Sequence, residues 1–296
     1  MNSAELISKV RKIEIKTRGL SKQIFAGEYH SAFKGQGMAF SEVREYQYGD
    51  PIRNIDWNVT ARFNKPFIKV FEEERELTVM LLIDVSASND FGTQSRFKRE
   101  FMTEIAAVLA FSAIQNNDKI GVIFFTDRVE RFIPPKKGKK HIMRIILELL
   151  DFEPKHNETS IPEALRYFTN AIKKRSTAFL LSDFVQTDEN SRNQLKDSLT
   201  LTNKKHDLVA LRIKDQGEYS LPEMGMVRFE DPETGKLQWV DTSSKKIRKY
   251  MTNWLDKEDS QINETLLRSG VDFAELYTGA DYVSNLMKLF KKRGRR

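Results

Sequence analysis

Three oxygen-bearing side chains follow one apolar run, and their types and spacing suit the binding of a cation. The run begins at Thr78 and ends at Ile83, and Asp84, Ser86 and Ser88 come directly after it at alternate positions. Carboxylate and hydroxyl oxygens are ligands for hard cations such as Mg²⁺ and Mn²⁺, which usually take one or two carboxylates and complete their shell with water. By itself, however, the pattern favours a simpler structure, in which the Asp and Ser side chains cap the turn after a strand.

Two later positions strengthen the metal-site interpretation. Asp183 follows a second apolar run, at the same point relative to its strand as Asp84, and Thr159 lies in the loop before a predicted helix. Because the carboxyl ends of parallel strands meet at one edge of an α/β sheet, these groups converge if their strands are neighbours. The sequence therefore predicts a Mg²⁺ or Mn²⁺ site built from carboxylates and hydroxyls: Asp84, Ser86, Ser88, Thr159 and Asp183.

The elements that position these residues are predicted by alternating patterns from residue 77 onward. Continuous apolar runs indicate strands buried on both faces, and longer runs with helical spacing separate them. This alternation predicts βαβ units and hence an α/β fold with a doubly wound, mostly parallel sheet. The predicted strands are 78–84, 119–125 with an extension at 128–133, 177–181, 207–213 and 272–276; the predicted helices are 96–116, 141–150, 160–171, 191–204, 244–268 and 281–291; and a hairpin joins 226–229 to 237–240.

Composition divides the chain into four predicted parts. Residues 1–20 carry a partial helical stripe, which indicates an N-terminal helix. Residues 21–76 alternate glycines, aromatic residues and charges without a clean period, which favours a small β-rich lobe. Residues 77–290 form the predicted α/β domain, and residues 291–296 are a basic tail.

One segment of the predicted lobe has two interpretations. Asp50, Arg53, Asp56 and Trp57 combine charge with an aromatic ring, a mixture that suits contact with a protein partner. Alternatively, Arg53 and Arg62 pair with Asp50 or Asp56, and Trp57 packs where the lobe meets the sheet. The structural alternative is the favoured one.

Composition excludes several classes of protein. Cysteine is absent from the 296 residues, which excludes disulfides, cysteine-bound zinc and thiol chemistry. No segment reaches the roughly 20 apolar residues that a membrane span needs, and the first residues lack the apolar core of a secretory signal. These features predict a cytoplasmic protein.

The positive charge is concentrated at one end of the chain. The final six residues, KKRGRR, carry five of the positive charges, so the formal net charge of +7 falls to +2 for the other 290 residues. A nearly neutral body does not favour nucleic acid as a partner. The tail is a candidate for peripheral contact with an anionic membrane surface, although such ends are more often solvated.

The order of the motifs resembles a known arrangement. Asp-x-Ser-x-Ser after a buried strand, a later Thr ahead of Ala164-Leu165, and an Asp after Leu-Leu-Ser are similar to the metal-ion-dependent adhesion site of von Willebrand factor A domains. Roughly residues 25–215 resemble the bacterial family catalogued as domain of unknown function 58. The upstream motifs that carry this likeness are Gly35-Gln36-Gly37, Phe40, Arg44, Tyr46, Gly49-Asp50, Arg53, Ile55-Asp56-Trp57, Ala61-Arg62 and Glu72-Glu73-Glu74.

The resemblance implies roles for the candidate residues. It implies that Ser86, Ser88 and Thr159 ligate the metal directly or through water, and that Asp84 and Asp183 often act through water. It also implies a partner that supplies a carboxylate, and an association with MoxR-type AAA+ ATPases or other von Willebrand factor A proteins of aerotolerance (Bat) operons. Many members of the family carry transmembrane segments ahead of the domain, and this sequence shows none, so membrane anchoring does not carry over.

Two functions remain open at this point. The leading hypothesis is a non-enzymatic, Mg²⁺-dependent protein-interaction module that serves as an adaptor for a MoxR-type ATPase. The sequence shows no GxxxxGKS or GxxxxGKT phosphate-binding loop, and no nucleophile–base pairing can be argued from its scattered histidines. The alternative is a metal-dependent phosphoester hydrolase, in which the ion activates water and Asp183 is the base.

Overall fold

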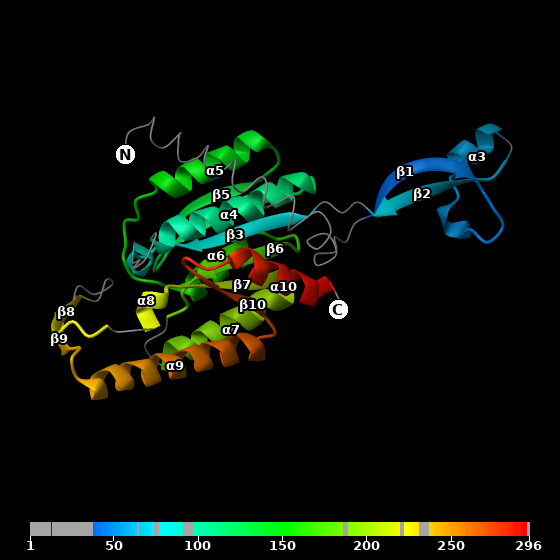
Figure 1. The fold of residues 1–296 in the computed structure, drawn as a ribbon. Helices are drawn as coiled ribbons and strands as arrows, with labels where there is room; N and C mark the ends of the chain where they lie inside the picture. Colours follow the sequence, from blue (N-terminus) through cyan, green and yellow to red (C-terminus); the bar gives the residue numbers. More distant parts are fainter. Residues whose placement is uncertain are drawn as a thin grey trace. The chain divides into compact units, whose positions relative to one another are not determined.

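The chain forms two compact units, one of Lys34–Leu77 and one that contains Thr78–Arg296 (Figure 1). The computed structural model describes Ile13 and residues 38–63, 65–73, 77–90, 97–185, 189–219, 222–230 and 237–294. The helix predicted over residues 1–20, apart from Ile13, and the glycine motif at 35–37 lie outside the described residues.

The smaller unit is built on a two-stranded antiparallel sheet, β1 with β2. Inside the connection between these strands, Ile55 forms a β-bridge to Ile68, whose side chain is buried. The connection therefore folds back on β2. The elements of this unit are β1 (Met38–Glu45), the short 3₁₀ helix η1 (Ile52–Asn54), α3 (Trp57–Phe63) and β2 (Phe67–Glu73).

The larger unit contains a six-stranded sheet in the order β10-β7-β6-β3-β4-β5. The first five of these strands run parallel, and β5 pairs antiparallel with β4 at the edge. The predicted α/β fold with a doubly wound, mostly parallel sheet is thus confirmed. The strands are β3 (Thr78–Asp84), β4 (Lys119–Phe125), β5 (Val129–Lys136), β6 (Thr177–Ser182), β7 (Asp207–Lys214) and β10 (Asp272–Tyr277).

Helices cover both faces of this sheet (Figure 1). On one face, Met80 and Leu82 of β3 belong to an apolar core that includes Leu165 of α6, Leu199 of α7 and Leu266 of α9. Burial of a strand on both faces explains why β3 reads as a continuous apolar run instead of an alternating one. The helices of this face are α6 (Ile161–Ala171), α7 (Glu189–Lys205) and α9 (Lys245–Arg268).

The opposite face is covered by a second helical layer (Figure 1). Phe101 of α4 meets Tyr282 of α10 edge-on at 5.4 Å between ring centroids, and Phe179 of β6 lies 6.3 Å from Phe290. Most residues of α4 are buried, which agrees with its largely apolar sequence. The helices of this face are α4 (Lys98–Gln115), α5 (Lys139–Asp151) and α10 (Tyr282–Gly294).

The strand order makes β3 the switch point of the sheet. Its neighbours are β4, which follows it in the chain, and β6, which lies on its other side. In open α/β sheets, ligands bind beyond the carboxyl ends of the strands at such a point. The loop after β3, which contains the 3₁₀ helix η2 (Ala87–Asp90), begins at this place.

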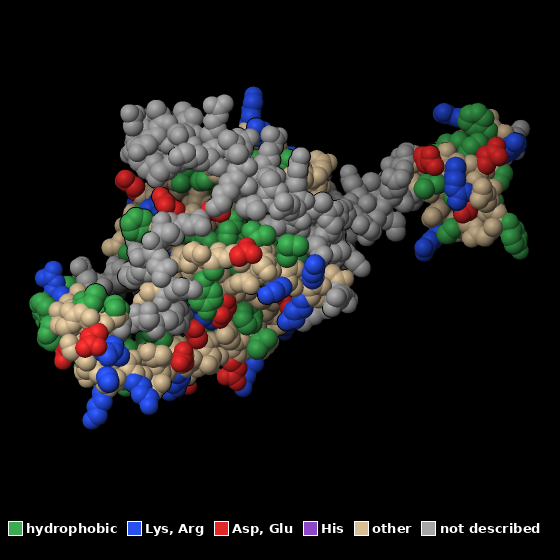
Figure 2. All heavy atoms as spheres, in the orientation of Figure 1, with side chains coloured by type: hydrophobic (Ala, Val, Ile, Leu, Met, Phe, Trp, Pro, Cys, Tyr) green, Lys and Arg blue, Asp and Glu red, His purple; other side chains and the backbone are tan. Residues whose placement is uncertain are grey.

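A smaller subassembly follows β7. It consists of the short helix α8 (Gln216–Tyr219) and the antiparallel hairpin of β8 (Met226–Glu230) and β9 (Leu237–Asp241), and the hairpin confirms the prediction for this region. Figure 2 shows apolar side chains at the surface over β8 and β9, where Met226 and Trp239 are exposed.

Two local features differ from the sequence prediction. Strand β5 continues through Pro134-Pro135 to Lys136 instead of ending at residue 133, which an edge strand tolerates because proline there removes no shared hydrogen bond. Helix α10 continues to Gly294, so it includes part of the predicted tail, and Arg293 donates to Asp272 at 2.8 Å.

None of the described helices is long and apolar enough to span a membrane.

Candidate metal centre

The carboxylate of Asp84 is the centre of the candidate site. It is fully buried at the end of β3, and its Oδ1 accepts hydrogen bonds from the Ser86 main-chain N at 3.0 Å and from Ser86 Oγ at 2.6 Å. Its Oδ2 accepts a bond from Ser182 Oγ, at the end of β6, at 2.7 Å. The Asp84 carboxylate therefore links the carboxyl ends of the neighbouring strands β3 and β6 by a hydrogen bond.

Ser88 and Thr159 lie on two loops that meet at the same end of the sheet. Ser88 lies in η2, and its Oγ is 3.2 Å from Ser86 Oγ. The loop that carries the half-buried Thr159 is joined to the same place, because Ala87 N donates to Asn157 O at 3.2 Å. The structure thus brings the loops after β3 and before α6 together.

Asp183 reaches the same edge from the end of β6 and is nearly buried. Its Oδ1 accepts a bond from Val185 N at 3.3 Å, and its Oδ2 lies 3.3 Å from Lys98 Nζ. Lys98 begins α4, is 1% exposed and also forms an ion pair with Glu218 of α8. Sequence reasoning missed this lysine; its one signal was a cation at the start of an otherwise apolar helix.

The electrostatics of this edge favour a further cation. Burial raises the pKa of Asp84 to about 7, and the nearby charge of Asp183 adds to the increase, although hydrogen bonds from Ser182 and Ser86 oppose it. Burial alone would lower the pKa of Lys98, but the neighbouring carboxylates outweigh burial and raise it. Two carboxylates close together at a buried edge are the arrangement that a divalent cation neutralises.

The residues present fit a hard cation. All five predicted ligands offer oxygen, and three of them are neutral hydroxyls. The described residues contain no group of three or more His, Cys, Asp or Glu side chains placed to hold a metal ion, so a site at this edge depends on the hydroxyls. Oxygen ligands with few carboxylates suit Mg²⁺ or Mn²⁺ better than a soft metal.

A cavity of about 190 Å³ lies next to Asp183. Val185, Glu218 and Trp254 contribute to its lining, together with Arg212 and other residues of β7 and α9. It therefore connects the end of β6 with the helix α9 that packs over this part of the sheet.

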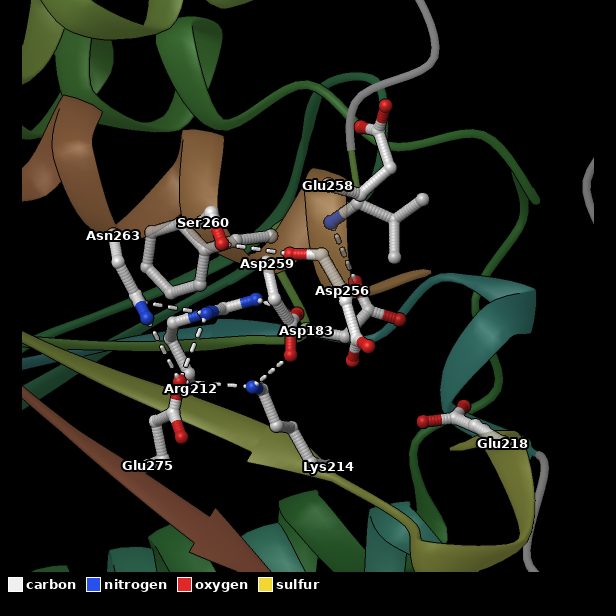
Figure 3. Close-up of polar contacts among 12 residues, drawn as sticks. Asp183, Arg212, Lys214, Glu218, Asp256, Glu258, Asp259, Ser260, Asn263 and Glu275 are labelled. Atoms are coloured by element: carbon white, nitrogen blue, oxygen red, sulfur yellow. Dashed lines mark hydrogen bonds and ion pairs between the residues drawn. The ribbon is translucent and has the colours of Figure 1, made fainter. Parts of the chain in front are cut away.

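A buried charge network forms another wall of this cavity (Figure 3). Arg212 and Lys214 are almost fully buried and project from β7 towards Asp259 of α9 and Glu275 of β10. Arg212 Nη2 lies 2.8 Å from Asp259 Oδ1, and Lys214 Nζ lies 2.8 Å from Glu275 Oε1. These opposite charges hold α9 against the sheet.

The acidic residues of the smaller unit have other partners than predicted. Asp50 accepts two bonds from Arg44, at 2.8 and 2.9 Å, instead of pairing with Arg53 or Arg62. A guanidinium from β1 reaches Asp50 with both of its terminal nitrogens, a geometry that fixes a carboxylate well. Arg53 is exposed.

Asp56 has a local structural role in the same unit. Its Oδ1 accepts main-chain bonds from Asn58 at 3.0 Å and Val59 at 3.3 Å, as an N-cap residue does at the start of a helix. Its other oxygen lies 3.4 Å from Lys69 Nζ. Trp57 is 68% exposed within this unit.

The comparisons with known proteins identify the family. The family described as protein of unknown function DUF58 matches residues 42–260, a range that begins within β1 and includes the candidate site and most of α9. The chain belongs to the DUF58 family. Gly35-Gln36-Gly37 and Phe40 precede the matched range, and the other predicted motifs, both upstream of β3 and after it, fall within it.

Relatives of this DUF58 protein are distant. Uncharacterized protein Rv1480 of Mycobacterium tuberculosis is 23% identical over 100% of this chain and 92% of its own length. Uncharacterized protein YeaD of Bacillus subtilis is 26% identical over 37% of this chain and 25% of its own.

Solved structures that resemble the chain include conserved hypothetical protein BatB from Bacteroides thetaiotaomicron, with 12% identity, a TM-score of 0.48 and coverage of 74% of this chain and 100% of that one. An aerotolerance-related membrane protein from Bacteroides fragilis has 14% identity and a TM-score of 0.49, over 74% of this chain and 98% of that one. The SpRpn10 VWA domain has 12% identity and a TM-score of 0.43, over 71% and 93%. TM-scores and sequence identities this low do not allow a function to be transferred from these proteins to this chain.

Proposed function

We propose that the protein is a non-enzymatic, Mg²⁺-dependent protein-interaction module. The observation that carries the proposal is the Asp84 carboxylate, which is buried at the sheet's switch point, bonded to Ser86 and Ser182, and close to the charge of Asp183. Ser86, Ser88 and Thr159 would hold Mg²⁺ or Mn²⁺, and Asp84 and Asp183 would orient its water molecules.

The neutral ligands define the partner's chemistry. When bound, the ion supplies an electrophilic centre that three hydroxyls leave under-neutralised. A carboxylate of a partner protein is the group that would complete its shell and offset its charge. The Asp84–Ser86 hydrogen bond supports this role, because it uses the hydroxyl proton and leaves Ser86 Oγ lone pairs for a cation.

The partner itself belongs to the same proposal. The family resemblance suggests a MoxR-type AAA+ ATPase or another von Willebrand factor A protein, for which this chain would be an adaptor. Asp50, Arg53, Asp56 and Trp57 remain candidates for a second contact; Arg53 and Trp57 are the exposed members of this set.

No observation favours the phosphoester hydrolase. Asp183, which would be its base, already accepts Val185 N and faces Lys98.

Metal binding is tested by calorimetric titration of Mg²⁺ into the wild type, Asp84→Ala and the control Ser112→Ala. Ser112 is a buried serine within α4 that bonds only to its own helix, at Val108 O, so its removal should leave binding intact. We expect binding heat in the wild type and the control and none in Asp84→Ala. Equal heats in all three, or none in the wild type at millimolar Mg²⁺, would refute the site.

The partner claim has its own test. A MoxR-type ATPase from the same organism should be retained on the immobilised protein in Mg²⁺ and released by a chelator. Retention that is indifferent to the chelator would refute a metal bridge.

A further inference from the structure

Lys98 places a buried positive charge beside a proposed metal ligand. It is the first residue of α4, its side chain is 1% exposed, and its Nζ lies 3.3 Å from Asp183 Oδ2. Burying an ammonium is unfavourable unless it is paired, so its position depends on the carboxylates around it.

The second carboxylate comes from a different part of the chain. Glu218 of α8 forms an ion pair with Lys98, and its Oε2 accepts a bond from Asp215 N at 3.2 Å. Asp183 at the sheet edge, Lys98 and Glu218 thus form a chain of alternating charges that joins the candidate metal centre to α8.

The surroundings give this chain room to rearrange. Asp183 and Glu218 both line the cavity of about 190 Å³, and Trp254 of α9 contributes to the same lining. Glu218 retains 28% exposure, whereas Asp183 retains only 8%. The Glu218 end of the bridge is therefore the more accessible one.

We propose that the Lys98 ammonium competes with the metal ion for Asp183 and that metal binding is thereby coupled to α8 through Glu218. This inference rests on the proposed function. A divalent cation near Asp183 and the ammonium repel each other strongly in a buried setting. Binding of the ion drives the Lys98 ammonium away from Asp183 and towards Glu218. A change at the metal centre therefore changes the contacts of α8, and a change in α8 alters the affinity for the ion.

A purely structural role for Lys98 makes the opposite prediction. If Lys98 only neutralises Asp183 to keep the edge folded, its removal disorders the site and weakens metal binding. If it competes, its removal leaves two carboxylates for the ion to neutralise and strengthens binding. The sign of the change in affinity separates the two roles.

The test compares Mg²⁺ affinity in the wild type, Lys98→Met and the control Lys174→Met. Methionine keeps the length and the apolar stem of lysine, and Lys174 is an exposed cation just before β6, at the opposite edge of the sheet. We expect Lys98→Met to lower the Kd for Mg²⁺ by about tenfold, with the control unchanged. An unchanged or raised Kd in folded Lys98→Met would overturn the inference.

Glu218→Gln is the second variant, and its carboxylate is exposed enough for the change to be tolerated. It leaves Asp183 as the remaining carboxylate for Lys98, so we expect a Kd raised several-fold. Equal Kd values for Glu218→Gln and the wild type would overturn the inference even if Lys98→Met failed to fold.

The coupling has a readout that does not depend on affinity. In a Trp57→Phe, Trp239→Phe background, Trp254 is the last of the three tryptophans and lines the same cavity as Glu218. Mg²⁺ should change its fluorescence, and Lys98→Met should bind Mg²⁺ without that change. A wild type and a Lys98→Met that both fail to bind Mg²⁺ would refute the proposed function, whereas binding by both with equal affinity would refute only the competition.

Discussion

Acidification should act on the stability of the larger unit through His206. Its side chain is fully buried just before β7, Nδ1 lies 3.1 Å from Ser176 Oγ, and the ring lies 4.4 Å from that of Phe168. Nε2 is buried and has no hydrogen-bond partner among the described residues. Burial first, and then the charges of Lys205 and Arg175, lower the pKa of His206 to about 4.

The sign and size of the effect follow from this shift. An unfolded His206, with a pKa of 6.5, binds a proton before the folded one does, so its contribution to stability is full above that value and is lost towards pH 4. Between pH 7 and pH 5 the loss is about 2 kcal/mol. Asp84 acts in the opposite direction: its folded pKa of about 7 lies above its ordinary 3.8, so acidification stabilises the folded state through this group.

Because the two contributions oppose each other, the assay is a difference between variants. Urea unfolding in a chelator at pH 7, 6 and 5 is measured for the wild type, His206→Gln and Asp84→Asn. The free energy of unfolding of the wild type relative to His206→Gln should fall by about 2 kcal/mol from pH 7 to pH 5. Relative to Asp84→Asn it should rise. Parallel pH profiles for the wild type and His206→Gln would refute the reasoning.

Three further substitutions test separate parts of the structure. Arg212→Met leaves the half-buried Asp259 with Lys214 still paired to it, and should lower the free energy of unfolding by about 1–3 kcal/mol in urea. Gly121→Ala would place its Cβ 2.8 Å from main-chain atoms of β5, and should destabilise by about 1–3 kcal/mol in the same assay. Ser182→Ala removes one donor to Asp84, and should weaken Mg²⁺ binding about fivefold in calorimetry, which corresponds to about 1 kcal/mol. Unchanged values would contradict, in turn, the buried ion network, the close approach of β4 and β5, and the positioning of Asp84.

The strands could be predicted from the sequence because strands that are buried on both faces consist of continuous apolar runs. The run from Thr78 to Asp84 is apolar without alternation, and that pattern arises only when both faces of a strand are covered. The end of β3 was therefore predicted correctly and the end of β6 to within one residue, and with them the approach of Asp84 and Asp183. The order of the strands in the sheet could not be predicted from local sequence patterns, because it depends on contacts between segments that are far apart in the chain.

The charged residues around the site were not predicted, for a related reason. Lys98 and Arg212 look like ordinary surface charges in the sequence, and the apolar residues that follow Lys98 do not show by themselves that it is buried. Glu218, the partner of Lys98, lies 120 residues further along the chain. Asp259, the partner of Arg212, lies 47 residues further along. Only packing of α4, α8 and α9 on the sheet brings these opposite charges together.

The most direct test of the proposed metal centre is anomalous diffraction from crystals soaked in Mn²⁺. We predict one strong peak beyond the carboxyl end of β3, at a bonding distance of about 2.1 Å from Ser86 Oγ and Ser88 Oγ. The peak should be absent from crystals of Asp84→Ala grown in the same form. A peak elsewhere, or no peak beside the two serines in the wild type, would contradict the account.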